Sequence, residues 1–197
     1  MPRPSTADQK RLEIVSTAAL IFDTDGYNAT NVDSIAQAVG LKKPSLYHYF
    51  AGKDEILFWV HEEFIDLLIS QYEARADADL SAADSLLEVM IDILRLMDTH
   101  RGHVRVFFEH HRELSKEHKV TIAAKRDRYT GMVEAEIERG IRDGEFRDMN
   151  PHRLTALALF GMCNWSYQWY RTGGARTSQE VAEYFWDLLM NGLRAKD

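Results

Sequence analysis

The chain has 197 residues, of which 45% are hydrophobic, and a formal net charge of −7 at pH 7. This composition excludes disorder as the default state, and the acidity argues against a protein that coats nucleic acid over its whole surface. Cys163 is the single cysteine, so an intrachain disulfide is excluded and a reducing, cytoplasmic location is expected. No run of about 18 apolar residues occurs, so we expect no membrane partner.

Hydrophobic periodicity predicts helices from the N-terminus onward and no strand. The first helix is expected over residues 5–25, where apolar side chains recur every three or four positions before Gly26. Asn31 is a suitable N-cap for a helix over 32–39. Pro44 lies in the first turn of a short third helix that ends near Phe50.

The remainder of the chain continues the helical pattern. Further helices are expected over 53–75, 81–100, 102–114, 117–142, 151–171 and 178–194. The sum is about nine helices, which predicts an all-α protein.

Residues 32–50 have the spacing of two helices that cross at a sharp angle. Ala36 is small where the two backbones approach, and Gly40 permits a left-handed turn. Leu46 is placed to pack the second helix on the first. This is helix-turn-helix spacing, although an ordinary helical hairpin would show the same three residues.

Basic and aromatic residues gather at this turn of an otherwise acidic chain. Residues 1–53 contain six Lys or Arg and five Asp or Glu, which gives this part a charge of +1. Ammonium and hydroxyl groups suit phosphates, and imidazole and phenol edges suit bases. Taken together, the residues favour contact with double-stranded DNA over packing in a core, where Phe50 is expected. The DNA-binding candidates are Asn31, Lys42, Lys43, Ser45, Tyr47, His48, Tyr49 and Lys53.

The run TNVDSIAQAVGLKKPSLYHYFAGKDEIL closely resembles the DNA-binding domain of TetR-family transcriptional regulators. The resemblance covers residues 10–57. It implies that Tyr47 and Lys53 contact phosphates and that Thr30 or Asn31 caps the second helix near the DNA backbone. It also implies that the groove-facing side chains are Lys43, Ser45, His48 and Tyr49.

The same resemblance implies two domains and a homodimer on a palindromic operator. Residues 1–52 are the expected helix-turn-helix DNA-binding domain, and residues 53–197 are the expected C-terminal helical ligand-binding and dimerisation domain. The helix over 178–194 is apolar on two faces, which suits dimerisation through the last two helices. Two faces buried within one chain would give the same pattern.

A small-molecule effector is expected inside the second domain. The segment WYRTGG, with the preceding NW, is similar to TetR regulators of lipid, fatty-acid and steroid catabolism that sense acyl-CoA thioesters. Methionine and aromatic side chains fit an irregular hydrophobic ligand, and basic groups fit an anionic one, although such a stripe is more often plain core. The lining candidates are Met97, Arg105, Phe108, His111, Met132, Met162, Trp165, Trp169 and Arg171.

Two alternatives belong to other functional classes. His103 and His110 lie seven residues apart with Glu113 nearby, which suits a TetR-like metal sensor, although solvent-facing or hydrogen-bonded histidines give the same spacing. A helical enzyme is disfavoured because no nucleophile elbow, P-loop or dinucleotide fingerprint occurs. The leading prediction is a ligand-responsive repressor that is not an enzyme and needs no cofactor.

Overall fold

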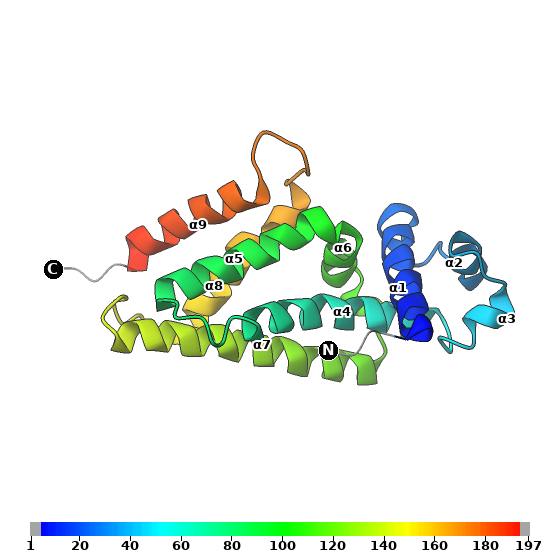
Figure 1. The fold of residues 1–197 in the computed structure, drawn as a ribbon, viewed down its shortest axis with the longest axis horizontal. Helices are drawn as coiled ribbons and strands as arrows, with labels where there is room; N and C mark the ends of the chain where they lie inside the picture. The colour runs from blue at the N-terminus through cyan, green and yellow to red at the C-terminus, as the bar shows by residue number, and fades with distance from the viewer. Residues whose placement is uncertain (1–4, 194–197) are drawn as a thin grey trace. The chain divides into compact units, whose positions relative to one another are not determined.

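The computed structural model describes residues 5–193, and every regular element in that range is helical (Figure 1). This confirms the predicted all-α fold. The α-helices are α1 (Thr6–Asp25), α2 (Val32–Ala38), α3 (Lys43–Leu46), α4 (Lys53–Glu73), α5 (Ala82–Thr99), α6 (Arg101–Glu109), α7 (Lys116–Arg142), α8 (His152–Asn164) and α9 (Ser178–Leu193). Two short 3₁₀ segments are η1 (His111–Glu113) and η2 (Trp165–Gln168).

Most helix ends follow local sequence signals. Ser5 and Asp8 form a capping box at the start of α1, and Asn31 caps α2 through a hydrogen bond from the Ser34 amide. Two expected helices are shorter than predicted. The helix expected over 151–171 ends as α8 at Asn164 and continues as η2, and the one expected over 102–114 ends as α6 at Glu109 before η1.

The chain forms two compact units. Unit 1 comprises Met1–Phe64 and His100–Ile122, and unit 2 comprises Ile65–Thr99 and Ala123–Asp197. Helices α4 and α7 each contribute residues to both units. This division differs from the expected boundary between residues 52 and 53, because α6 packs on α1 within unit 1. The expected boundary separates a DNA-binding domain from a regulatory domain by function, and it stays a prediction.

Within unit 1, α1 and α6 approach each other closely. A Cβ atom at Gly102 would lie only 2.8 Å from the backbone carbon of Ala19, so glycine is what permits this contact. Buried Ile14, Ala18 and Phe22 fill the inner face of α1. Helix α1, which also contacts α2 of the helix-turn-helix, is therefore fixed by buried apolar side chains.

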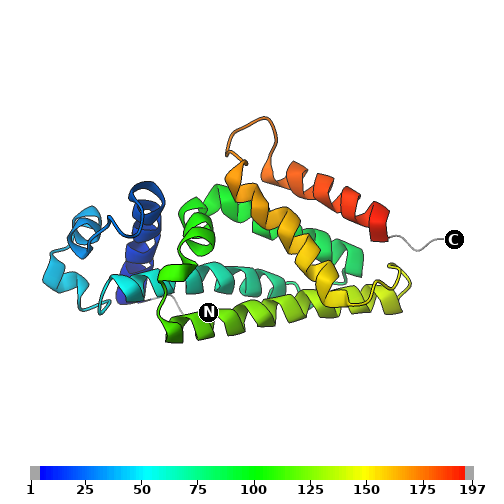
Figure 2. The same ribbon diagram turned by 180° about the vertical axis from the view of Figure 1, so that it is seen from behind.

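Within unit 2, α5 packs against both α8 and α9. Figure 2 shows α8 crossing in front of α5, with α9 beside them. Leu86, Met90 and Leu94 of α5 are completely buried in this arrangement. Their spacing of four residues places them on one face of the helix, which accounts for the burial.

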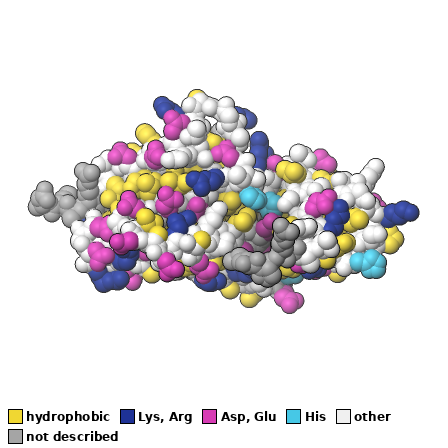
Figure 3. Space-filling model, viewed as in Figure 1, with side chains coloured by type: hydrophobic (Ala, Val, Ile, Leu, Met, Phe, Trp, Pro, Cys, Tyr) yellow, Lys and Arg dark blue, Asp and Glu magenta, His cyan; other side chains and the backbone are white. Residues whose placement is uncertain are grey.

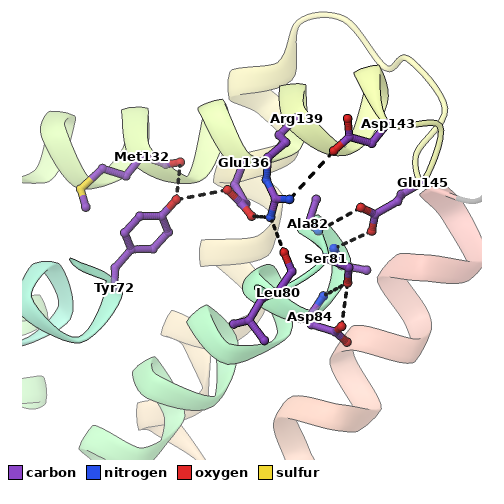
Figure 4. Close-up of polar contacts among 11 residues, drawn as sticks. Tyr72, Leu80, Ser81, Ala82, Asp84, Met132, Glu136, Arg139, Asp143 and Glu145 are labelled. Carbon is purple, nitrogen blue, oxygen red and sulfur yellow. Dashed lines mark hydrogen bonds and ion pairs between the residues drawn. The ribbon is translucent and has the colours of Figure 1, made fainter. Parts of the chain in front are cut away.

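Polar contacts fix the ends of the helices in unit 2 (Figure 4). The Glu145 carboxylate accepts hydrogen bonds from the amides of Ala82 and Ala83, at 3.0 and 2.9 Å, and so caps α5. Arg139 of α7 pairs with Glu136 and donates to the Leu80 carbonyl at 3.0 Å. These contacts tie α7 to the start of α5.

Among the described residues, no helix combines the length and the apolar character needed to cross a membrane.

Candidate functional site

The turn between α2 and α3 has a rigid frame. Gly40 adopts a φ of +68°, which a side chain would disfavour, and the Leu41 amide donates to the Ala36 carbonyl at 2.8 Å. Leu46 is completely buried beneath the turn, and Ala36 is nearly so. The three residues singled out by spacing therefore hold α3 against α2.

Residues 42–49, which we call the recognition segment, present their polar side chains outward. Lys42, Lys43 and His48 are exposed, and Tyr47 is 47% exposed despite its large ring. Ser45 and Tyr49 are half-buried. Figure 3 shows Lys, Arg and His side chains standing out at the α3 end of unit 1. This surface has the donors and ring edges that duplex DNA requires.

Arg11 of α1 holds the end of the recognition segment in place. Its guanidinium donates to the Tyr49 carbonyl and lies 5.1 Å from the ring centre of Phe50. Phe50 itself is buried, as expected. Sequence reasoning missed Arg11, because 38 positions separate it from Tyr49 and no local pattern connects them.

Lys43 forms an exposed ion pair with Asp33, with 2.8 Å between the ammonium nitrogen and the carboxylate oxygen. The hydrogen bond from Lys43 to Asp33 raises the pKa of Lys43, so the ammonium group stays charged. Exposed pairs of this kind contribute little stability. Lys43 can therefore exchange Asp33 for another acceptor at small cost.

Lys53 lies differently from the other candidates. Its ammonium group donates to the carbonyls of Tyr27 and Thr30, at 2.8 and 2.9 Å, and lies 4.2 Å from the Tyr27 ring centre. An ammonium group has three donors, so these two bonds leave one for a phosphate. Lys53 thus braces the loop before α2, and its predicted phosphate contact stays a prediction.

The nine effector candidates do not form one cluster within either unit. Arg105, Phe108 and His111 belong to unit 1, and the Arg105 guanidinium lies 3.1 Å from the Asp23 carboxylate. The other six candidates belong to unit 2. Of these, Met97 is buried, Met132 and Met162 are half-buried, and Trp165, Trp169 and Arg171 are exposed.

The proposed metal ligands are engaged in separate pairs. His103 Nε2 lies 3.1 Å from Glu63, and His110 Nδ1 lies 3.8 Å from Glu113. Within residues 5–193, no group of three or more His, Cys, Asp or Glu side chains is arranged to hold a metal ion. The metal-sensor alternative therefore gains no support from the structure.

An apolar hollow of about 580 Å³ lies on α8 and α9 of unit 2. Leu154 and Leu188 in its wall are 61% and 50% exposed. Leu157 of α8 and Trp165, which directly follows α8, are also exposed. Such a group of exposed apolar side chains is typical of a surface that another protein covers.

Two family models match the chain. The one described as "Bacterial regulatory proteins, tetR family" matches residues 14–59, and the one described as "Tetracyclin repressor-like, C-terminal domain" matches residues 79–193. The first match contains the whole recognition segment. Both confirm the resemblance that the sequence indicated.

Relatives with similar sequences and structures are transcriptional regulators. The HTH-type transcriptional repressor KstR2 of Mycobacterium tuberculosis is 25% identical over 187 residues, which are 94% of each chain. The TetR family regulator PfmR from Thermus thermophilus is 31% identical, with a TM-score of 0.84 over 92% of this chain and 99% of that one. AibR, solved with isovaleryl coenzyme A and operator DNA, is 24% identical, with a TM-score of 0.81 over 92% of this chain and 98% of that one. At this identity the comparison shows that the two chains have a similar fold.

Proposed function

Because the chain belongs to the TetR family of bacterial regulatory proteins, we propose that it is a homodimeric repressor that leaves a palindromic operator when a hydrophobic effector binds. The observation that carries the proposal is the recognition segment. Its Lys42, Lys43, Tyr47 and His48 side chains are exposed, while Leu46 and Phe50 beneath them are buried. Exposed polar side chains on a short helix that is held by buried residues suit the major groove of DNA.

The DNA contacts follow from the exposure of each side chain. Lys42 supplies an ammonium group and Tyr47 a hydroxyl for phosphates, and Lys43 faces the groove. His48 and Tyr49 present ring edges to the bases. Neutralising phosphates releases counterions, so binding should weaken steeply with salt.

The dimer forms through α8 and α9. Support comes from the exposed Leu154, Leu157, Trp165 and Leu188 on and beside these elements. Pairing the face with a second copy would remove these side chains from water, and the burial of apolar surface favours association. A dimer places two recognition segments one helical turn of DNA apart, about 34–36 Å.

The effector is a hydrophobic or acyl-CoA-type molecule bound in unit 2. The similarity of WYRTGG to acyl-CoA-responsive regulators supports this class. AibR, which has a similar fold, was solved in complex with isovaleryl coenzyme A. An effector that prefers the conformation of the dimer that does not fit the operator lowers operator affinity, by at most its difference in binding free energy between the two conformations.

Selection of bound duplexes from a random library, followed by fluorescence anisotropy on the selected site, tests the proposal. Tyr47→Ala should raise the Kd for that site about tenfold, which is about 1.4 kcal/mol. Lys42→Ala should reduce the slope of log K against log salt by about 0.9. Arg126→Ala is the matched control, because this exposed residue of α7 lies in unit 2.

Equal losses in the control would show a general charge effect and contradict the assigned contacts. Unchanged binding by Tyr47→Ala and Lys42→Ala would remove the recognition segment from the interface.

A further inference from the structure

The apolar hollow of about 580 Å³ on unit 2 contains a single cation in its wall. The wall comes from the loop after α7, from α8 and from the second half of α9. Seven of the ten described residues that line it are apolar, and Arg147 is the one that carries a charge. The volume lies in the range of about 300–1,000 Å³ that is typical of small-molecule sites.

Arg147 brings an unpaired donor to this wall. Its side chain is half-buried, and its Nε atom is buried without a hydrogen-bond partner among the described residues. The neighbouring acid Asp148 lies 2.9 Å from His152 instead. A guanidinium is always charged, and a buried N–H that lacks a partner loses its hydration without compensation. The hollow therefore contains a cationic donor whose acceptor the described chain does not supply.

The loop that carries Arg147 is fixed at its start. The amides of Glu145 and Phe146 both donate to the Gly140 carbonyl, at 2.8 and 3.1 Å. The Glu145 carboxylate caps α5 (Figure 4), and the Phe146 ring is buried where any side chain at Gly140 would clash with it. Arg147 follows directly, so its backbone is held in place before a ligand arrives. Binding then requires little ordering of the loop.

The hollow lies on the face that we assign to the dimer. Leu154 and Leu188 are exposed, line the hollow and belong to that face. A second copy on this face would cover the hollow, so that a bound molecule would be buried on most sides, as ligands usually are. The symmetry of the dimer would give each copy the same covered site.

We propose that the hollow binds an amphipathic anion, a hydrocarbon chain with a carboxylate or phosphate group, whose charged end pairs with Arg147. The inference rests on the proposed function and gives its hydrophobic effector a location and a charge. The apolar wall removes the chain from water. The guanidinium offers donors that match the oxygens of a carboxylate or a phosphate. A neutral or cationic ligand would leave Arg147 unpaired, so the wall selects an anion.

The probes are decanoic acid, decyl phosphate and decanoyl coenzyme A, with 1-decanol as the uncharged compound. Isothermal titration calorimetry on the full chain measures each Kd. At least one anionic probe should bind at a ratio of one molecule per protomer and about tenfold or more tightly than 1-decanol. The anion that binds best distinguishes a carboxylate, a simple phosphate and a coenzyme A thioester as the source of the charge.

Arg147→Met removes the charge and keeps a long apolar side chain. The Kd of the anionic probe should rise about tenfold or more, and the Kd of 1-decanol should stay unchanged. Because the Nε atom has no partner to lose, the unliganded variant should unfold at no lower a temperature than the wild type. Arg142→Met is the matched control, since this exposed residue in the last turn of α7 lies outside the wall. The control should bind every probe like the wild type.

Ala158→Phe gives a second test that does not depend on Arg147. Ala158 is an exposed residue of α8 in the wall, so the new ring would occupy the hollow and not the core. Binding of the anionic probe should be lost, because the ring takes the space of the hydrocarbon chain.

Four results would overturn the proposal. They are equal binding of the anion by Arg147→Met and the wild type, a lower unfolding temperature of unliganded Arg147→Met, unchanged binding by Ala158→Phe, and a panel in which no anion binds. In the last case, sedimentation that shows a weaker dimer of Ala158→Phe would mean that the second copy fills the hollow with its own side chains.

The operator readout keeps this inference separate from the proposed function. An anion that releases DNA equally from the wild type and Arg147→Met supports the repressor and removes the site. An anion that needs Arg147 yet leaves operator binding unchanged supports the site and contradicts ligand-controlled repression through it.

Discussion

The recognition segment of unit 1 and a group of three residues in unit 2, Arg75, Asp92 and Tyr129, use similar polar side chains in opposite surroundings. In the recognition segment, Lys42 and Tyr47 are exposed above a frame that is fully packed. In unit 2, the Nη2 atom of Arg75 and the hydroxyl of Tyr129 are buried and have no hydrogen-bond partner among the described residues. Exposed donors stay hydrated until DNA arrives and cost little stability. A buried donor without a partner costs stability. The first region therefore keeps its polar groups at little cost, while the unpaired groups of the second reduce the stability of unit 2.

Breaking the frame beneath the recognition segment should give the largest effect. Leu46→Ala removes a completely buried side chain and should reduce the free energy of unfolding by about 2–5 kcal/mol. Leu12→Ala on α1, where the side chain is 49% exposed, should change it by less than about 0.5 kcal/mol. Urea denaturation of both variants measures the difference. Similar losses would mean that Leu46 is not part of the frame.

The frame was predictable from sequence because its contacts are local. Ala36, Gly40 and Leu46 lie within eleven positions, and helical spacing alone places them together. The exposed residues between Lys42 and His48 follow from the same local geometry. Lys53 was harder to predict, because its partners Tyr27 and Thr30 lie more than twenty positions away.

The ion pair of Arg75 with Asp92 and the buried Tyr129 escaped sequence reasoning for the same physical reason. Arg75, Asp92 and Tyr129 are separated along the chain, and each looks like an ordinary helix-surface or core residue by itself. Only the packing of unit 2 brings Arg75 to within 2.6 Å of Asp92. The expected stripe of methionine and tryptophan residues was a weaker guide, since Trp165 and Trp169 are exposed. A single sequence contains no signal for such long-range pairing.

Unit 1 also contains a buried polar group, His61, and burial disfavours the charged form of its imidazole. His61 is completely buried, with Nδ1 at 3.0 Å from the Leu57 carbonyl, and burial lowers its pKa to about 4. The unfolded chain binds this proton near pH 6.5, but the folded chain resists it until about pH 4. The effect of His61 on the free energy of unfolding is therefore absent above about pH 6.5. As the pH decreases to about 4, protonation of His61 in the unfolded chain lowers that free energy by about 3 kcal/mol.

Unfolding free energies measured between about pH 7 and pH 4 check this expectation. His61→Leu should flatten the decline, because the variant has no imidazole to protonate at that position. An equally steep decline in the variant would assign the pH dependence to other groups.

Two glycines give the smallest expected effects. Gly102→Ala should destabilise the protein by about 1–3 kcal/mol, because the new Cβ would meet the Ala19 backbone at 2.8 Å. Gly131→Ala, on the exposed face of α7 with no atom within 4 Å of the new Cβ, should stabilise it by about 0.5–1 kcal/mol. Thermal unfolding of the pair gives the signs. Equal signs would contradict the close approach of α1 and α6.

Titration of the full chain against a duplex selected from a random library, followed by footprinting, tests the central claim most directly. The account predicts salt-sensitive binding to a site with two symmetric half-sites about one helical turn apart. A protein that selects no duplex, or that binds all duplexes equally at every salt concentration, would contradict it.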